Sequence, residues 1–217
     1  METPEVKGVL DRLFAESDGQ VAAWRSGEAS FPQVARSATA AEQAEAYSQM
    51  YLSITPGTGR FLYSLVRAAR PVLVVEYGMS FGISTLHLAA AVRDNGVGRV
   101  VTTELSPHKI AAARASFAAA GLDDVITVLE GDARETLAAL TGPVDFVLLD
   151  GWPELDHSVL AAVEPKLVPG ALVLAENAGM AEDASFLEHV RNPANGYASS
   201  SFGIPGKGTL EISCRTV

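Results

Sequence analysis

The chain has 217 residues, which is enough for one domain with a large buried core and short for two. Hydrophobic residues make up 48% and charged residues 19%, a composition typical of a folded globular protein. The formal net charge of −10 argues against nucleic acid as a partner, because phosphate binding requires clustered lysines and arginines and the sequence holds no such cluster.

Cysteine content and the length of the apolar runs indicate the compartment. The single cysteine, Cys214, excludes an intramolecular disulfide, which is consistent with a reducing cytosol. The longest apolar runs have the length of strands and are too short to cross a bilayer. We therefore expect a cytoplasmic protein that has no membrane partner.

The first seventy residues have helical periodicity. Apolar residues recur at helical spacing in two groups, Val9, Leu10, Leu13 and Phe14, and then Tyr47, Met50, Tyr51 and Ile54. Pro56 then opens a further helix. We expect residues 1–55 to form an N-terminal helical segment and residues 56–217 the ligand-binding part of one compact domain.

From Pro71 onward, strand-like and helix-like segments alternate. Runs of Val, Leu and Ile predict strands at Val72–Val75, Val100–Thr103, Val125–Leu129, Val144–Leu149 and Ala171–Ala175. Amphipathic segments between them predict helices at Ile83–Val92, Pro107–Ala119, Arg134–Leu140 and Leu155–Leu167. This alternation is typical of an α/β fold with a doubly wound, mostly parallel sheet. Tyr197–Phe202 and Thr209–Cys214 flank a turn rich in Gly and Pro, Gly203–Gly208, and predict a closing antiparallel hairpin, which makes seven strands.

Acidic residues stand at or just after the ends of the predicted parallel strands: Glu76, Glu104, Asp132, Asp150 and Glu176. Ligands of open α/β sheets bind beyond the carboxyl ends of the strands, so we expect these acids to surround a ligand. Each one alone has a second interpretation as the cap of the following helix. For Asp132, a cap on the helix at Arg134 stays an open alternative to a contact with a ligand.

The turn after the first strand, Glu76–Ser84 (EYGMSFGIS), has the most specific pattern. Gly78 permits a sharp turn and a close approach of the backbone to a ligand, and Gly82 lets the next helix pack against the sheet. The spacing differs from the Gly-x-Gly-x-x-Gly of pyrophosphate binders. Glu76 suits an ammonium group and Ser84 a carboxylate, so the pair predicts binding of an amino-acid tail. Glu104 ends the next strand, where an acid accepts hydrogen bonds from ribose hydroxyls.

These motifs resemble a known family. From about Ile54 to the C-terminus the chain is similar to the cation-dependent small-molecule O-methyltransferases, the family of catechol and caffeoyl-CoA O-methyltransferases within the class I S-adenosylmethionine-dependent methyltransferases. The motifs that match in order and spacing are Glu76–Ser84, Glu104, Gly131–Ala133, Asp150–Trp152 and Glu176–Asn177. The resemblance implies a Rossmann-like fold, S-adenosylmethionine as cofactor and a small, aromatic, catechol-like acceptor. It also implies a homodimer, with the N-terminal segment contributing to the dimer and to an acceptor lid.

The resemblance also implies which residues form the site. The family's cofactor contacts carry over to Ile54, Glu76, Gly78, Ser80, Ser84, Glu104, Ala133 and Asp150, and Asp132 is expected at the adenine edge. The family's divalent cation would lie between Asp150, Glu176 and Asn177. All three ligands are oxygens, which suit Mg²⁺ or Ca²⁺.

Two residues depart from the family's pattern. Glu176 is one methylene longer than the usual Asp, and the alternative to a metal ligand is a hydrogen-bonding residue in a site that has lost its metal. Pro153 stands where many relatives have a Lys that acts as general base. Three explanations stay open: a metal-bound acceptor ionises without a protein base, His157 one turn further on is the base, or catalysis is altered or lost. Trp152 either walls the acceptor pocket or packs over the sheet edge.

The leading hypothesis is transfer of a methyl group from S-adenosylmethionine to a hydroxyl of a small acceptor, with Asp150 and His157 as the catalytic residues. The alternative is a protein that binds S-adenosylmethionine without turnover, which Pro153 and Glu176 favour. A nicotinamide-dependent oxidoreductase is disfavoured by the glycine spacing and by the terminal hairpin.

Overall fold

The computed structural model of the chain describes residues 3–35, 38–180, 184–204 and 208–217. Its helices are α1 Pro4–Ser26, α2 Ala40–Ala46, α3 Pro56–Ala69, α4 Ile83–Asn95, α5 Pro107–Ala119, α6 Ala133–Thr136, α7 Asp156–Val163 and α8 Ser185–Arg191. Its strands are β1 Leu73–Tyr77, β2 Arg99–Glu104, β3 Ile126–Glu130, β4 Val144–Leu149, β5 Leu167–Glu176, β6 Tyr197–Ile204 and β7 Gly208–Arg215.

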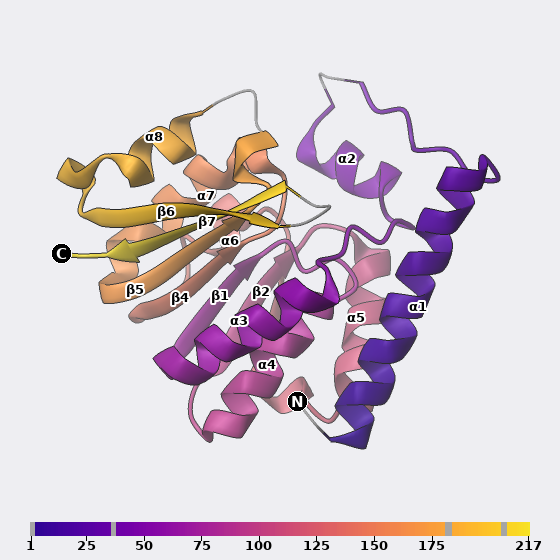
Figure 1. Ribbon diagram of the computed structural model, residues 1–217, viewed down its shortest axis with the longest axis horizontal. Coiled ribbons are helices and arrows are strands. Elements are labelled where there is room, and N and C mark those ends of the chain that lie inside the picture. The colour runs from indigo at the N-terminus through magenta and orange to yellow at the C-terminus, as the bar shows by residue number, and fades with distance from the viewer. Residues whose placement is uncertain (1–2, 36–37, 181–183, 205–207) are drawn as a thin grey trace.

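The strands form one seven-stranded sheet in the order β3-β2-β1-β4-β5-β7-β6 (Figure 1). Neighbours among β1 to β5 run parallel, whereas β7 pairs antiparallel with both β5 and β6. The predicted doubly wound sheet and its closing hairpin are therefore confirmed. Pro205, Gly206 and Lys207 of the predicted turn lie outside the described residues.

Helices cover both faces of the sheet, because each face buries its own apolar cluster. On one face α1, α3, α4 and α5 enclose a core that includes Leu13, Leu62, Leu86 and Phe117. On the other face α6, α7 and α8 pack over a second core that includes Leu160. The uninterrupted apolar strands of the sequence follow from this double coverage.

The helical reading of residues 47–54 is wrong. Helix α2 ends at Ala46, a turn follows, and residues 50–55 have no regular structure. Two of the apolar residues in this stretch, Met50 and Ile54, are still buried, whereas Leu52 is exposed. A side chain from α1 replaces helical hydrogen bonds here: Gln20 donates to the carbonyl of Gln49 (2.8 Å) and accepts from the amide of Tyr51 (2.7 Å).

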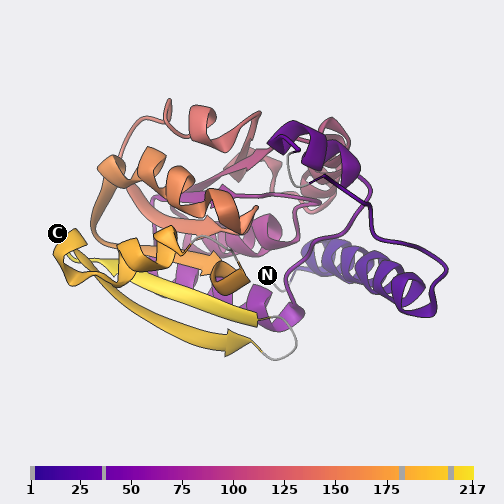
Figure 2. The same cartoon turned by 90° about the horizontal axis from the view of Figure 1, so that it is seen from above.

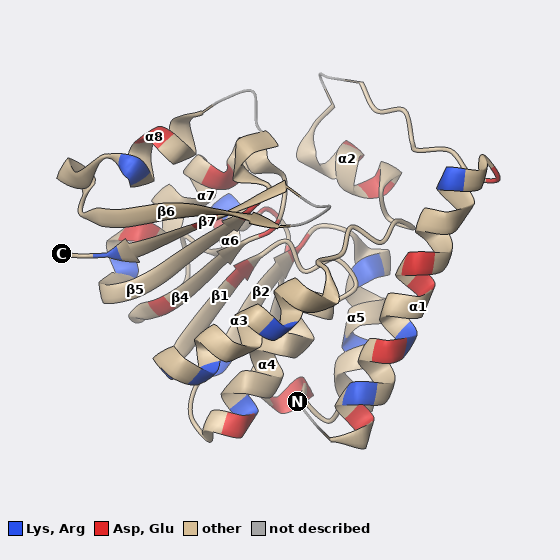
Figure 3. Ribbon diagram, in the orientation of Figure 1, with Lys and Arg blue, Asp and Glu red and all other residues tan. Residues whose placement is uncertain are grey.

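Helix α1 lies along α4 and α5, and the chain returns from its far end to α2 above the sheet (Figure 2). Acidic and basic residues are interspersed along α1 (Figure 3) and are exposed, whereas its apolar residues join the first core. None of the helices in the described residues has the length and apolar character that a membrane span requires.

Candidate functional site

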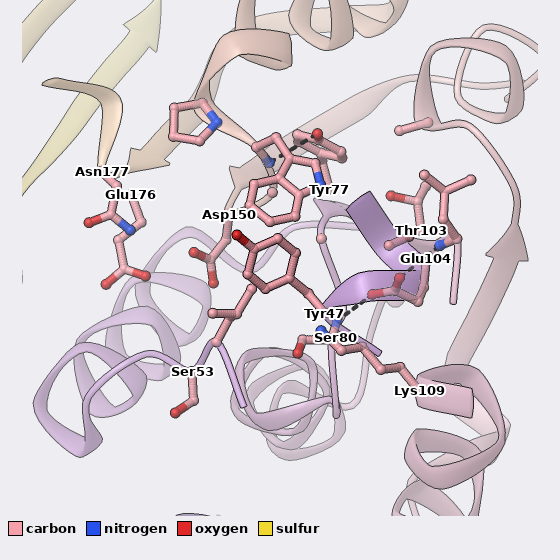
Figure 4. Close-up of a pocket in the computed structure, with 18 of the residues that line it drawn as sticks. Tyr47, Ser53, Tyr77, Ser80, Thr103, Glu104, Lys109, Asp150, Glu176 and Asn177 are labelled. Carbon is pink, nitrogen blue, oxygen red and sulfur yellow. Dashed lines mark hydrogen bonds between the residues drawn. The ribbon is translucent and has the colours of Figure 1, made fainter. Parts of the chain in front are cut away.

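A cavity of about 310 Å³ opens at the carboxyl ends of β1, β2, β4 and β5, where the chain order of the strands reverses. Helix α2 and residues 47–53 cover it from the N-terminal side. Figure 4 shows the polar side chains that face into it. Of the residues that the sequence predicts for the site, this cavity is lined by Gly78, Ser80, Glu104, Ala133, Asp150, Trp152, Glu176 and Asn177.

The turn after β1 touches the turn after β4. Gly78 has φ +94°, in the left-handed region, and a Cβ at this position would stand 2.5 Å from the carbonyl oxygen of Asp150. The amide of Asp150 donates to the carbonyl of Tyr77 (2.9 Å), which joins the two turns. Only glycine fits such a turn, because both the conformation and the close backbone exclude a side chain. Gly78 therefore forms a junction between the two turns, and its contact with a ligand stays a prediction.

Glu104 faces the cavity with its carboxylate held by backbone amides. Its Oε2 accepts from the amide of Ser80 (2.9 Å), and its Oε1 accepts from the amides of Leu105 (2.8 Å) and Ser106 (2.9 Å). These bonds fix the carboxylate at the pocket wall, and its remaining lone pairs are able to accept from a ligand's hydroxyl groups. The structure is compatible with the predicted acceptance from ribose hydroxyls, which stays a prediction.

Glu76 lies deeper, below the turn, and is completely buried. Its Oε2 accepts from the hydroxyls of Thr85 (2.5 Å) and Thr102 (2.6 Å), whereas its Oε1 has no hydrogen-bond partner in the described part of the chain. Burial raises the pKa of Glu76, and the hydroxyls of Ser84, Thr102 and Thr85 act in the opposite direction. A cationic group next to Oε1 would satisfy this oxygen and favour the ionised form.

A second, smaller cavity of about 10 Å³ adjoins the first at Gly78, Ser80 and Asp150. Ile54 and Ser84 line this smaller cavity. Apart from Glu76 and Asp132, the predicted cofactor residues therefore line two adjoining cavities, from Ala133 past Glu104 to Ser84. Glu76 lines neither cavity and reaches them only through its neighbours on the turn.

Asp132 takes the alternative role that the sequence leaves open. It is the N-cap of α6, where its Oδ1 accepts from the amide of Arg134 (2.8 Å) and its carboxylate pairs with the Arg134 guanidinium. Asp132 does not line the cavity, whereas Gly131 and Ala133 on either side of it do. The segment therefore meets the cavity through its small residues.

Three oxygen-bearing side chains predicted as metal ligands lie on one side of the cavity (Figure 4). Asp150 follows β4, Glu176 ends β5 and Asn177 comes next with φ +59°. Glu176 is 4% exposed, and no group in the described residues donates to its Oε1. Among the described residues no three His, Cys, Asp or Glu side chains cluster in a way that could hold a metal, so the set depends on the Asn177 amide.

Aromatic side chains wall the opposite part of the cavity. The ring of Trp152 lies 5.1 Å from that of Tyr47, which comes from the end of α2, and Pro153 lines the wall beside them. His157 is not part of this wall: it lies on α7 with its ring 5.2 Å from that of His189. The structure therefore gives no support to His157 as a base.

Sequence reasoning missed Tyr47, Tyr77 and Lys109, which also line the cavity. Lys109 has a signal that could have found it, because it stands in the first turn of the helix that follows Glu104. Tyr47 has none, since its place over the cavity depends on how α2 packs against the rest of the molecule.

Comparison with known proteins places these observations in context. A sequence profile described as "Methyltransferase domain" matches residues 75–178. The catechol O-methyltransferase of Mycobacterium tuberculosis is 32% identical over 127 residues, which are 58% of this chain and 57% of that enzyme. The catechol O-methyltransferase of Sus scrofa is 29% identical over 140 residues, 61% of this chain and 74% of that enzyme. The chain thus spans little more than half the length of the mycobacterial relative.

A solved structure shows the shared fold over most of the chain. The O-methyltransferase TomG from Streptomyces achromogenes, crystallised in complex with S-adenosylmethionine, has a TM-score of 0.72 at 21% identity. The superposition covers 91% of this chain and 96% of that one. The N-terminal elements, which lie outside the profile match, therefore belong to the common architecture.

Proposed function

We propose that this chain is a member of the cation-dependent small-molecule O-methyltransferases of class I and transfers a methyl group from S-adenosylmethionine to a hydroxyl of a small aromatic acceptor. The observation that carries the proposal is the arrangement around Glu104: an anchored carboxylate lies between a glycine turn and the part of the cavity that Gly131 and Ala133 line. The residues along the two adjoining cavities would complement a ligand in which a nucleoside is joined to an amino acid.

The buried carboxylate of Glu76 supports binding of the amino-acid tail. Its Oε1 is left without a donor among the described residues, and the hydroxyl of Ser84 lies close to it. A ligand ammonium at this end would supply the missing donor. Ile54 and Ser84 line the adjoining cavity, so the tail would run below residues 50–55.

Residues on the acceptor side fit a divalent cation, because Asp150, Glu176 and Asn177 offer only oxygens and the buried Oε1 of Glu176 has no other described partner. When bound, such a cation lowers the pKa of an acceptor hydroxyl and holds it in place. We include Mg²⁺ or Ca²⁺ in the proposal as a cofactor on this ground.

The protein's own contribution is mainly alignment and exclusion of water. Trp152 and Tyr47 form an apolar wall against which a planar acceptor would stack. The acceptor oxygen attacks the methyl carbon as the carbon–sulfur bond breaks, which yields a methyl ether and S-adenosylhomocysteine, and the hydroxyl proton leaves to water. The proposal assigns no general base, because Pro153 has no ionisable group and His157 lies away from the cavity.

The assembly and the compartment belong to the same proposal. By resemblance to the family we propose a cytoplasmic homodimer in which residues 1–55 contribute to the interface and to the acceptor lid. The position of Tyr47 over the cavity supports the lid. Size-exclusion chromatography with light scattering tests the dimer.

The activity is tested by incubating purified protein with S-adenosylmethionine and catechol, with Mg²⁺ or with EDTA, and measuring the products by mass spectrometry. A methyl ether that forms with Mg²⁺ and is lost with EDTA is the expected result. If no ether forms from any acceptor in a panel of catechols and phenols, the proposed reaction is wrong.

Pro153 favours a second candidate, a protein that binds S-adenosylmethionine without turnover. It lines the cavity, and by the family resemblance many relatives have a basic lysine at this position. Calorimetric binding of S-adenosylhomocysteine, combined with no product from the acceptor panel, would support this candidate over the enzyme.

A further inference from the structure

Lys109 is a cationic residue whose side chain is almost completely buried and lines the cavity. Lys109 is 5% exposed and lines the cavity, and Figure 4 places it on the same side as Glu104 and Ser80. Its Nζ lies 5.7 Å from the centre of the Phe81 ring, and it donates no hydrogen bond to any residue in the described part of the chain. The aromatic face replaces only part of the lost hydration, because an ammonium has three donors to satisfy.

The fold alone does not favour a lysine here. Lys109 is the third residue of α5, a position where the helix dipole favours an acidic side chain over a basic one. Burial also lowers the pKa of Lys109, with the charge of Glu104 acting in the opposite direction. An apolar side chain of the same length would avoid both costs. A buried charge in such a place is therefore better explained by a ligand than by packing.

Glu104 identifies the part of the ligand that the lysine meets. Its two oxygens already accept hydrogen bonds from three backbone amides. Their remaining lone pairs can accept further hydrogen bonds from hydroxyl groups of a ligand. Each hydroxyl that donates to Glu104 keeps lone pairs of its own, which require a donor. Lys109 is the cation beside Glu104 that lines this cavity.

We propose that Lys109 binds the cofactor by donating a hydrogen bond to a ribose hydroxyl oxygen, while the same diol donates to Glu104. The inference rests on the proposed function, since it requires a nucleoside at Glu104. It adds a ligand-binding residue that no motif of the chain assigns. The two charges then act as a pair: one accepts from the diol and the other donates to it.

The test compares binding of S-adenosylhomocysteine and of its 2′,3′-dideoxy analogue by calorimetry. Lys109→Met keeps the length of the side chain and removes the donor. We expect this variant to bind S-adenosylhomocysteine about tenfold more weakly or worse, since hydrogen bonds to charged groups are among the strong ones. The dideoxy analogue should bind to wild type and variant with nearly the same affinity. Lys7→Met, at an exposed lysine of α1, removes a charge without touching the cavity and serves as the control.

Thermal unfolding separates this role from a structural one. Without ligand, Lys109→Met should melt at the wild-type temperature or above it, because an unpaired buried ammonium is replaced by an apolar chain. Equal binding of S-adenosylhomocysteine by wild type and variant overturns the inference and leaves the proposed function intact. An equal loss for both ligands overturns the contact with the diol. Wild-type protein that binds neither ligand overturns the proposed function as well.

Discussion

Asp156 is a buried carboxyl group that the proposed mechanism does not use. It is 1% exposed at the start of α7, and neither of its oxygens has a partner among the described residues. Burial raises the pKa of Asp156 to about 8, and the charge of Glu154 adds to the rise. The folded protein therefore holds a proton here that the unfolded chain releases near pH 4.

This difference makes stability depend on pH. Between about pH 4 and pH 8 the folded state binds one more proton than the unfolded state, so Asp156 reduces the free energy of unfolding as the pH rises through this range. We expect Asp156→Asn to raise the free energy of unfolding at pH 8.5 by about 2 kcal/mol or more, relative to its effect at pH 4, because each pKa unit corresponds to ~1.4 kcal/mol. Urea denaturation at both pH values measures it.

The exposed Asp11 of α1 gives the matched control, since Asp11→Asn removes a carboxylate that water already solvates. A pH-independent effect of Asp156→Asn would show that this carboxyl ionises in the folded protein as it does in the unfolded chain.

For single residues, the sequence predicted which side chains lie near the cavity better than it predicted what those side chains contact. Position at a strand end was enough to find Glu104 and Glu176, because parallel strands end at one edge of the sheet. It did not decide Asp132, whose carboxylate is engaged by Arg134 two residues later. The sequence also suggested His157 as a site residue, because residue spacing does not show which face of α7 points toward the cavity.

The turn between β1 and α4 acts as a structural element in its own right. We expect Gly78→Ala to lower the free energy of unfolding by about 3 kcal/mol and to abolish binding of S-adenosylhomocysteine. The added methyl meets the Asp150 carbonyl oxygen at 2.5 Å, and φ is +94°. Urea denaturation and calorimetry measure the two effects.

Gly96 provides a control for backbone strain alone. It ends α4 with φ +67°, but a Cβ there would have no atom within 4 Å. Gly96→Ala should cost only about 1 kcal/mol and leave binding unchanged. If the two variants lose the same stability, the contact with the Asp150 turn does not restrict Gly78.

Residues 47–55 are a second element whose order depends on one side chain. Gln20 satisfies a carbonyl at Gln49 and an amide at Tyr51. Gln20→Ala removes both bonds, and we expect the Tyr51 amide to exchange with deuterium roughly fivefold faster, since a lost hydrogen bond is worth ~1 kcal/mol. Hydrogen exchange read by NMR or mass spectrometry measures the rate.

Asp18→Ala, at a neighbouring exposed position of α1, should leave that exchange rate unchanged. Unchanged exchange in Gln20→Ala would show that the segment is ordered by its buried residues Met50 and Ile54 alone.

Hydrophobic periodicity predicted the helices and strands well where a pattern fits only one kind of secondary structure. Helix α5 has the predicted bounds, and β4 does as well. Helix α6 stops after four residues, at Thr136, although the predicted pattern continued to Leu140. Residues 47–54 show why such errors occur: inward apolar residues at helical spacing also fit an irregular segment whose hydrogen bonds come from elsewhere.

For the molecule as a whole, the alternation of strands and helices was sufficient to predict the sheet, and the sheet places the site. The sequence could not predict that α2 and the residues after it cover the cavity. This arrangement depends on the contact between Tyr47, at the end of α2, and Trp152, after β4, which are more than a hundred residues apart. No local pattern encodes such a contact.

Ligand binding should stabilise the entire fold, since the cavity is lined by residues from both the N-terminal cover and the sheet. At a ligand concentration of about one hundred times Kd, S-adenosylhomocysteine should add ~2.7 kcal/mol to the free energy of unfolding. For a chain of this size that corresponds to an increase in Tm of roughly 5–10 °C. Scanning calorimetry measures the increase, and NAD at the same concentration should cause none. Stabilisation by NAD alone would restore the oxidoreductase hypothesis.

The place of β7 in the sheet has a consequence for synthesis. β7 lies between β5 and β6 although it follows both along the chain, and the amide of Asn177 donates to the carbonyl of Thr209. During translation, β5 therefore leaves the ribosome with one edge unpaired until residues 208–215 have emerged. We expect the part of the sheet that β1 to β4 form to assemble first and the pairing of β5 with β7 to come last.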